Sequence, residues 1–231
     1  SNAVLFPVVV DSDATNRIER LQQVLLEGTR LSLATVVPIA ATLMVLAQPL
    51  VLVWVGPKML GSAIIIQILS LAVALRVGNA TSTTLLKGAG RIRYLASVNI
   101  VTGLVNLALS AALVKPFGLP GVAIGTVLPV AVSSTFVLWP AACRRVRLPL
   151  GRAFHHAVWP AVWPGIVVAI CLDLSRHAVP VTFVMVAAQA AAAGLLYLLL
   201  FGIAVGPSDR AQYAAKLMEL FGGRDGLAPA A

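Results

Sequence analysis

Charged residues are scarce in this chain of 231 residues, of which only 11% are Asp, Glu, Lys or Arg and 59% are hydrophobic. Soluble domains average about 25% charged and about 45–50% apolar residues. A soluble core of this length could not bury so much apolar surface, because the surface of a folded domain shrinks too slowly with size. The scarcity of charge therefore argues against a soluble domain and indicates that lipid is the solvent.

Combinations of residues typical of enzymes and metal sites are also missing. The three histidines, His155, His156 and His177, are accompanied by no carboxylate pair, no metal-ligand spacing and no Gly-rich phosphate loop. His155 and His156 fall at a predicted membrane boundary, where an interfacial role is expected. We therefore predict a protein that is not an enzyme, with no catalytic residues, no metal and no cofactor.

The two cysteines, Cys143 and Cys171, are predicted at opposite ends of membrane spans. A disulfide requires Cα atoms within about 7 Å, so this separation excludes a bond between them. We interpret both as small apolar residues of the interior.

Six long apolar runs dominate the sequence, at residues 31–53, 62–86, 93–114, 119–142, 154–173 and 181–205. Each has close to the roughly 20 residues that a helix needs to cross about 30 Å of hydrocarbon. The runs must be helical, because isolated strands in lipid would leave backbone groups unpaired. Prolines within them predict local kinks, at Pro38, Pro129, Pro160 and Pro164. The predicted fold class is an all-α polytopic membrane helix bundle of about six transmembrane helices.

Shorter segments flank the runs. An apolar stub at 3–10 is too short to span and is interpreted as the end of a severed helix, so we expect the chain to be a fragment. Ile18, Leu21, Leu25 and Leu26 share one face of a predicted amphipathic helix that leads into the membrane. The predicted organisation is a truncated helix end with a cytoplasmic amphipathic segment (1–30), the six-helix bundle (31–205), and a cytoplasmic interfacial helix with a disordered tail (206–231).

Lys and Arg alternate between rich and poor connections, with counts of 3, 1, 3, 1, 4, 1 and 3 along the chain. Cytoplasmic loops carry the excess of Lys and Arg in membrane proteins, so the rich connections and both ends are predicted to be cytoplasmic. The net charge of +9 could suggest a nucleic-acid partner. However, short basic clusters between apolar runs are typical of membrane topology, and we expect no nucleic-acid binding.

Arg76 is the one basic residue well inside an apolar run, about ten residues before Lys87. An Arg at the bilayer centre costs about 2.5–3.5 kcal/mol, so it normally faces a water-filled cavity or a partner. The runs contain no acidic residue apart from Asp173 at an edge. Arg76 either lines a cavity for an anionic substrate, or is a structural residue that bonds helix carbonyls or pairs with an acid elsewhere.

Several polar residues accompany Arg76. Asn79 lies in the same run, and Asn99 and Asn106 share a face of the next because they are seven residues apart. They either line a hydrophilic cavity or make contacts between helices worth under about 1 kcal/mol each. The candidate substrate-binding residues are Arg76, Asn79, Asn99 and Asn106. Gly121-x-x-x-Gly125 matches a small-residue motif that predicts close helix packing.

Three motifs mark membrane turns and helix starts: Pro49-Leu50-Val51-Leu52-Val53-Trp54-Val55-Gly56, Thr83-Thr84-Leu85-Leu86-Lys87-Gly88-Ala89-Gly90-Arg91, and Phe117-Gly118-Leu119-Pro120-Gly121-Val122-Ala123-Ile124-Gly125-Thr126. Through them, residues 1–150 resemble the polysaccharide-flippase branch of the MOP exporter superfamily. The resemblance implies a multi-pass protein of the bacterial inner membrane, with two pseudo-symmetric lobes around a cavity that works by alternating access. This chain would then be the C-terminal lobe, with an N-terminal lobe of the same protein as its partner, and would be inactive alone.

The resemblance implies a flippase for undecaprenyl-pyrophosphate-linked oligosaccharide in the biosynthesis of polysaccharides such as lipopolysaccharide. Lipid-linked oligosaccharide and membrane lipids would be its partners. The peptidoglycan-lipid flippase branch shares this chemistry and is not separated from it. A cation-coupled multidrug exporter of the same superfamily is an alternative, although such exporters favour intramembrane carboxylates, which the runs lack. A membrane assembly subunit without transport activity is a further alternative.

Overall fold

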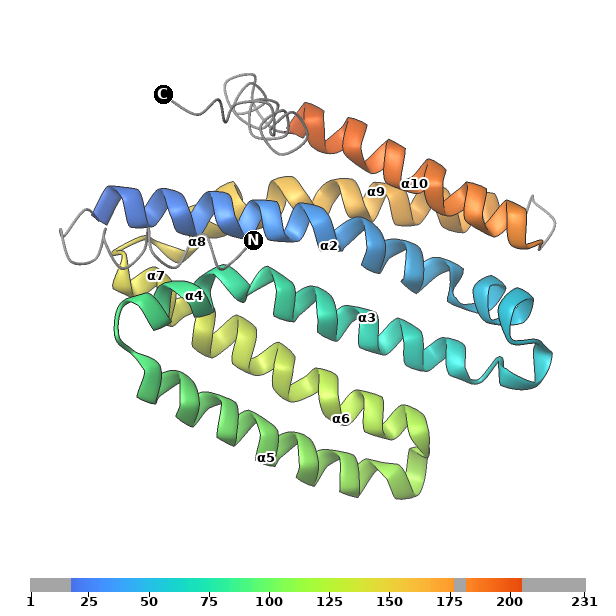
Figure 1. Cartoon of the computed structure of the whole chain (residues 1–231), viewed down its shortest axis with the longest axis horizontal. Helices are drawn as coiled ribbons and strands as arrows, with labels where there is room; N and C mark the ends of the chain where they lie inside the picture. Colours follow the sequence, from blue (N-terminus) through green and yellow to red (C-terminus); the bar gives the residue numbers. More distant parts are fainter. Residues whose placement is uncertain (1–17, 177–181, 205–231) are drawn as a thin grey trace, which may run out of the picture.

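The computed structural model describes residues 18–176 and 182–204, which are almost entirely helical and contain no strand (Figure 1). In chain order the elements are α2 (Ile18–Trp54), the 3₁₀ helix η1 (Pro57–Met59), α3 (Ser62–Gly78), α4 (Ala80–Gly88), α5 (Ile92–Phe117), α6 (Leu119–Val132), the π-helix η2 (Ser133–Leu138), α7 (Trp139–Arg145), α8 (Leu150–Ala153), the π-helix η3 (Phe154–Val158), α9 (Trp159–Arg176) and α10 (Phe183–Ala204).

Six helical spans in the described ranges are long and apolar enough to cross a membrane. They are Ile18–Trp54, Ser62–Gly88, Ile92–Phe117, Leu119–Arg145, Leu150–Arg176 and Phe183–Ala204. Their outer faces expose large apolar side chains, such as Leu107 on α5 (69% exposed) and Leu199 on α10 (68%). Contiguous apolar surface of this kind is unfavourable in water and is stable in lipid. The predicted all-α bundle of about six transmembrane helices is confirmed.

The first span is longer than predicted. α2 runs without a break for 37 residues, or about 55 Å at 1.5 Å per residue. The expected boundary at residue 30 is therefore not a structural break. Leu21 and Leu25 of the predicted amphipathic face are buried, at 2% and 0% exposure, and belong to a core cluster with residues of α4, α5, α7 and the α7–α8 connection. The predicted segments 3–10 and 206–231 lie outside the described residues.

α2 occupies the centre of the bundle and contacts α3, α4, α9 and α10. α3 packs in turn on α6, and α5 lies at the edge with α6 as its main neighbour (Figure 1). A Cβ atom on Gly121 would lie 2.1 Å from the Leu113 carbonyl oxygen, and one on Gly125 would lie 2.7 Å from the Ser110 backbone nitrogen. The predicted Gly-x-x-x-Gly packing site is therefore confirmed as the close approach of α6 to α5.

Three of the spans are interrupted within the bundle. The second changes from α3 to α4 at Asn79, whose backbone angles are φ −96° and ψ 2°. The fourth and fifth contain η2 and η3, and each π-helix ends immediately before a Trp-Pro pair, Trp139-Pro140 or Trp159-Pro160. Proline lacks an N–H and crowds the carbonyl four residues earlier, and the wider π turn relieves both problems.

The proline predictions were incomplete. Pro160 is associated with a distortion, as predicted, whereas α2, α6 and α9 continue through Pro38, Pro129 and Pro164. Pro140, which follows the other π-helix, was not among the predicted kinks.

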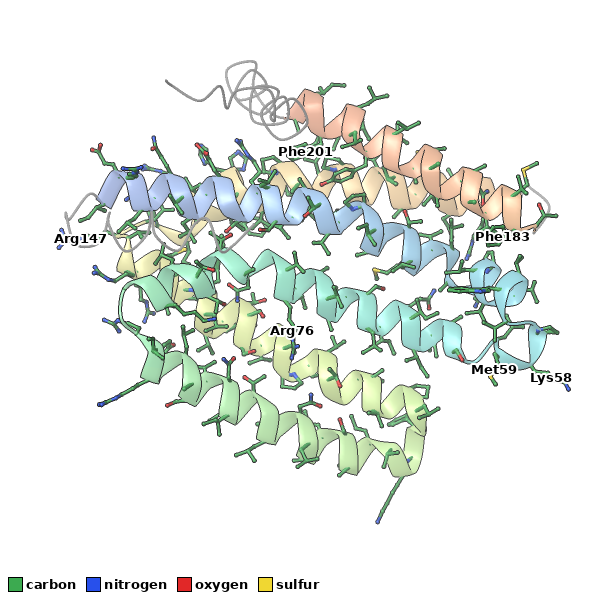
Figure 2. The ribbon with its side chains drawn as sticks, in the orientation of Figure 1. Lys58, Met59, Arg76, Arg147, Phe183 and Phe201 are labelled. Atoms are coloured by element: carbon green, nitrogen blue, oxygen red, sulfur yellow. The ribbon has the colours of Figure 1, made fainter. Side chains whose placement is uncertain are left out.

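The connections that are rich in Lys and Arg lie at the same end of the bundle. The α4–α5 and α7–α8 connections lie at one end of the bundle, here called the basic end, together with the start of α2 (Figure 1). Figure 2 shows Arg147 at this end and Lys58 at the other. Antiparallel neighbours of membrane length place every second connection on the same side. The prediction that the basic end faces the cytoplasm stays a prediction.

Candidate functional site

A polar cavity of about 450 Å³ lies between α3, α5, α6 and η2. It is lined by Arg76, Asn79, Thr83, Asn99, Thr102, Gly103, Asn106, Val130, Ser133, Ser134 and Leu138. All four candidate residues from the sequence, Arg76, Asn79, Asn99 and Asn106, are therefore brought together in one cavity. We call this feature the polar cavity.

Arg76 lies in the last turn of α3, and its side chain extends from that helix toward α6 and α5 (Figure 2). It is an exposed residue although it lies deep within a membrane span. Within the described residues, its guanidinium has no hydrogen bond to a helix carbonyl and no ion pair. The carbonyl end of α3 supplies negative partial charge, which favours a cation at this position. Of the two interpretations from sequence, the geometry favours a cation that lines a cavity.

Asn79 fills the interruption between α3 and α4 and is buried, with 6% of its surface exposed. Its Nδ2 donates a hydrogen bond to the Ser134 backbone oxygen at 2.9 Å. That carbonyl belongs to η2 and also accepts the backbone N–H of Trp139. The Asn79 side chain therefore joins two helix interruptions. Its Oδ1 is buried without a hydrogen-bond partner among the described residues.

Asn99 and Asn106 face the cavity from α5, as their shared helical face predicted. The Asn106 Oδ1 accepts hydrogen bonds from Ser110 Oγ at 3.0 Å and from Thr126 Oγ1 at 3.3 Å. Asn106 thus connects α5 to α6, so the packing interpretation holds for its oxygen. No described residue accepts a hydrogen bond from its amide nitrogen, which is left for a ligand or water. Asn99 is exposed within the cavity wall and makes no side-chain hydrogen bond to a described residue.

Sequence analysis missed the contribution of η2. Ser133 and Ser134 belong to a run that looked uniformly apolar, yet both line the polar cavity. The available signal was a Ser-Ser pair shortly before the Trp-Pro pair at 139–140. A proline distortion close to small polar residues marks a place where polar groups are presented inside a membrane bundle.

A second cavity, the apolar groove, has a volume of about 660 Å³. It lies between α2, α3, η2, α7, η3 and α9, and most of its lining residues are aliphatic or aromatic, including Leu33, Val37, Met44, Leu71, Phe154 and Ile166. Asn79 and Ser134 line both this groove and the polar cavity. The hydrogen bond between them therefore lies in the wall that the two cavities share.

Neither cavity is lined by a described histidine or cysteine, the other residue types that could act in catalysis or metal binding. His155 and His156 are exposed in η3, and His156 Nδ1 lies 3.0 Å from the Arg152 carbonyl oxygen. No group of three or more His, Cys, Asp or Glu side chains is placed to hold a metal ion within the described part of the chain. Cys143 is buried and Cys171 is exposed, and both are free thiols. His177 lies outside the described residues.

The polar cavity combines one unpaired cation with amides and hydroxyls, and no carboxylate is among its lining residues. Such a set favours an anionic or oxygen-rich ligand over a cation. No protein-family model, no curated protein and no solved structure matches this chain. A functional assignment therefore depends on the geometry of the two cavities.

Proposed function

We propose that this chain belongs to a transporter that flips undecaprenyl-pyrophosphate-linked oligosaccharide across the bacterial inner membrane for polysaccharide biosynthesis. The observation that carries the proposal is the position of Arg76, a cation within a membrane span that lines the polar cavity. Its side chain has no ion-pair or hydrogen-bond partner among the described residues. An Arg so placed is expensive to insert, by about 2.5–3.5 kcal/mol on the lower scale, and such residues mark substrate pathways.

The chemistry of the cavity fits the two parts of such a headgroup. A guanidinium binds phosphate oxygens through a planar fork of donors, which suits a pyrophosphate. Asn99, the Asn106 amide and the Thr102 and Ser133 hydroxyls line the same cavity and suit sugar hydroxyls. The absence of a carboxylate from the cavity lining weighs against the cation-coupled multidrug alternative.

The apolar groove supports an amphiphilic substrate. The groove adjoins the polar cavity at Asn79 and Ser134. In this proposal the anionic head of the lipid binds in the polar cavity, and part of its chain lies in the groove. A purely polar solute would have no use for the second cavity. In this proposal a second lobe covers the open side of the polar cavity, and the basic end faces the cytoplasm, where lipid-linked precursors are made.

The proposal is tested by replacing Arg76 with Ala, Lys and Glu in the protein as the host makes it, with membrane expression checked for each variant. Surface polysaccharide and lipid-linked oligosaccharide in the cytoplasmic leaflet are measured. We expect Ala and Glu to abolish export and Lys to keep part of it, since Lys retains charge without the planar fork. Arg93→Ala, an exposed change at the basic end, is the matched control and should export normally.

Normal export by all three Arg76 variants would contradict the proposal. It would favour a membrane assembly subunit, because such a protein tolerates loss of the cavity cation apart from effects on stability.

A further inference from the structure

A second group of cations lies outside both cavities, at the end of α7, in the short α7–α8 connection and in α8. Arg144, Arg147 and Arg152 are exposed there, and their side chains make no ion pair and no hydrogen bond with any described residue. The described acidic residues near this end are Glu19 and Glu27, both on α2. The guanidinium groups of Arg144, Arg147 and Arg152 therefore form a concentrated positive patch without an acidic partner among the described residues.

The backbone of this connection is fixed rather than loose. Leu148 N–H bonds to the Cys143 carbonyl at 2.9 Å, and Gln22 Nε2 of α2 donates to the Val146 carbonyl at 2.8 Å. Val146 and Leu148 are buried, at 0% and 7% exposure, in the core cluster of the basic end. Anchoring on both sides of residue 147 holds its side chain outward, as Figure 2 shows.

Arg147 occupies an unfavourable backbone conformation. Its φ of 54° is the only positive value at a non-glycine residue in the described ranges. This position follows the end of α7, where glycine is preferred because it has no Cβ to crowd the neighbouring carbonyl. Membrane topology requires only that basic residues be present in the connection, at any position. An Arg at the position least suited to it indicates that the location of this cation matters.

The surroundings of the patch indicate its ligand. Only four residues, 146–149, separate the two helical spans, so the patch lies at the membrane boundary. Leu150 and Phe154 follow directly and are 46% and 51% exposed. Cations at the boundary beside exposed apolar side chains match a molecule with an anionic head and apolar chains.

We propose that Arg144, Arg147 and Arg152 bind the phosphate-bearing headgroup of an anionic phospholipid in the leaflet at the basic end. The phosphate accepts hydrogen bonds from the guanidinium groups, and the acyl chains lie along Leu150 and Phe154. This site is separate from the polar cavity and does not depend on the proposed transport function, although Phe154 also lines the apolar groove.

The test measures the binding of phosphatidylglycerol to the purified protein in detergent by native mass spectrometry, with phosphatidylcholine of the same acyl chains as the uncharged reference. Arg144→Gln, Arg147→Gln and Arg152→Gln are combined in one variant. The control variant combines Lys87→Gln, Arg91→Gln and Arg93→Gln, which removes the same charge from the neighbouring connection at the same end.

We expect the first variant to bind phosphatidylglycerol at least fivefold more weakly and the control to change by less than twofold. Equal loss in both variants would overturn the site, because it would show attraction by overall charge alone. Retained binding in the first variant would overturn it as well. Inorganic phosphate that binds as well as the lipid would also overturn the proposal, because it would show a site for a free anion.

Arg147→Gly keeps the test valid if the triple variant folds poorly. Glycine relieves the backbone conformation at this position, so the melting temperature without lipid should rise while binding of phosphatidylglycerol weakens. A variant that is more stable and binds the lipid as well as the original protein would contradict the proposal.

Discussion

The polar cavity and the apolar groove share a wall but are built in opposite ways. The polar cavity contains a cation, three asparagines and several hydroxyls, whereas the groove is almost wholly apolar. Asn79 and Ser134 belong to both, and the hydrogen bond between them joins the interruptions of two spans. The contrast shows that the wall between the polar and the apolar cavity is built where two spans leave regular α-helix, because Asn79 and Ser134 both lie at interruptions.

The comparison is tested most strongly by changing helix packing on the polar side. Gly125→Ala places a Cβ 2.7 Å from the backbone nitrogen of Ser110, which cannot move without shifting α5. We expect a loss of about 1–3 kcal/mol in stability, typical of overpacking, and a distorted Asn99–Asn106 wall. Thermal unfolding in detergent measures the effect.

Gly103→Ala is the matched control, because a Cβ at Gly103 meets no atom within 4 Å. It should leave stability unchanged or raise it by about 0.5–1 kcal/mol, since alanine favours helix. Equal destabilisation by the two changes would show that close packing of α5 on α6 does not support the cavity.

A bulky side chain placed in the apolar groove tests whether the groove takes part in transport. Ala169→Trp adds a large side chain to the lining, and we expect roughly tenfold slower export, equivalent to about 1.4 kcal/mol. Ala187→Trp on the exposed face of α10 adds the same bulk toward lipid and should have little effect. If both variants export at the same rate, the groove does not take part in transport.

A change in the wall that the two cavities share should have the smallest effect on stability. Asn79→Ala removes the donor to the Ser134 carbonyl, which keeps its bond from Trp139. We expect a loss of about 1 kcal/mol of stability, the usual net contribution of one hydrogen bond. A loss much above this value for Asn79→Ala would mean that the contact holds the whole bundle together rather than dividing two cavities.

Length and hydropathy alone predicted the six spans, because crossing hydrocarbon imposes the same requirement on every helix. They could not locate the boundary of α2, since the amphipathic turns before residue 30 continue the same helix and pack on the α7–α8 connection. Hydropathy carries no information on whether an amphipathic segment lies flat on a membrane or packs against protein.

The polar cavity was predictable in part. Arg76 was identified by its cost in lipid, and Asn99 and Asn106 by their helical spacing. Ser133 and Ser134 were missed, because their contribution depends on a π-helix beside Pro140. The apolar groove was not predicted at all, since its lining residues come from several distant segments and look like ordinary lipid-facing side chains.

The central claim is that Arg76 receives an anionic lipid-linked head. The direct measurement is the affinity of the purified protein, as the host makes it, for two lipids with identical isoprenoid chains, one with a pyrophosphate-linked sugar and one with a neutral linkage. We predict at least tenfold tighter binding of the pyrophosphate lipid, and loss of this preference in Arg76→Gln. An unchanged preference in Arg76→Gln would contradict the account.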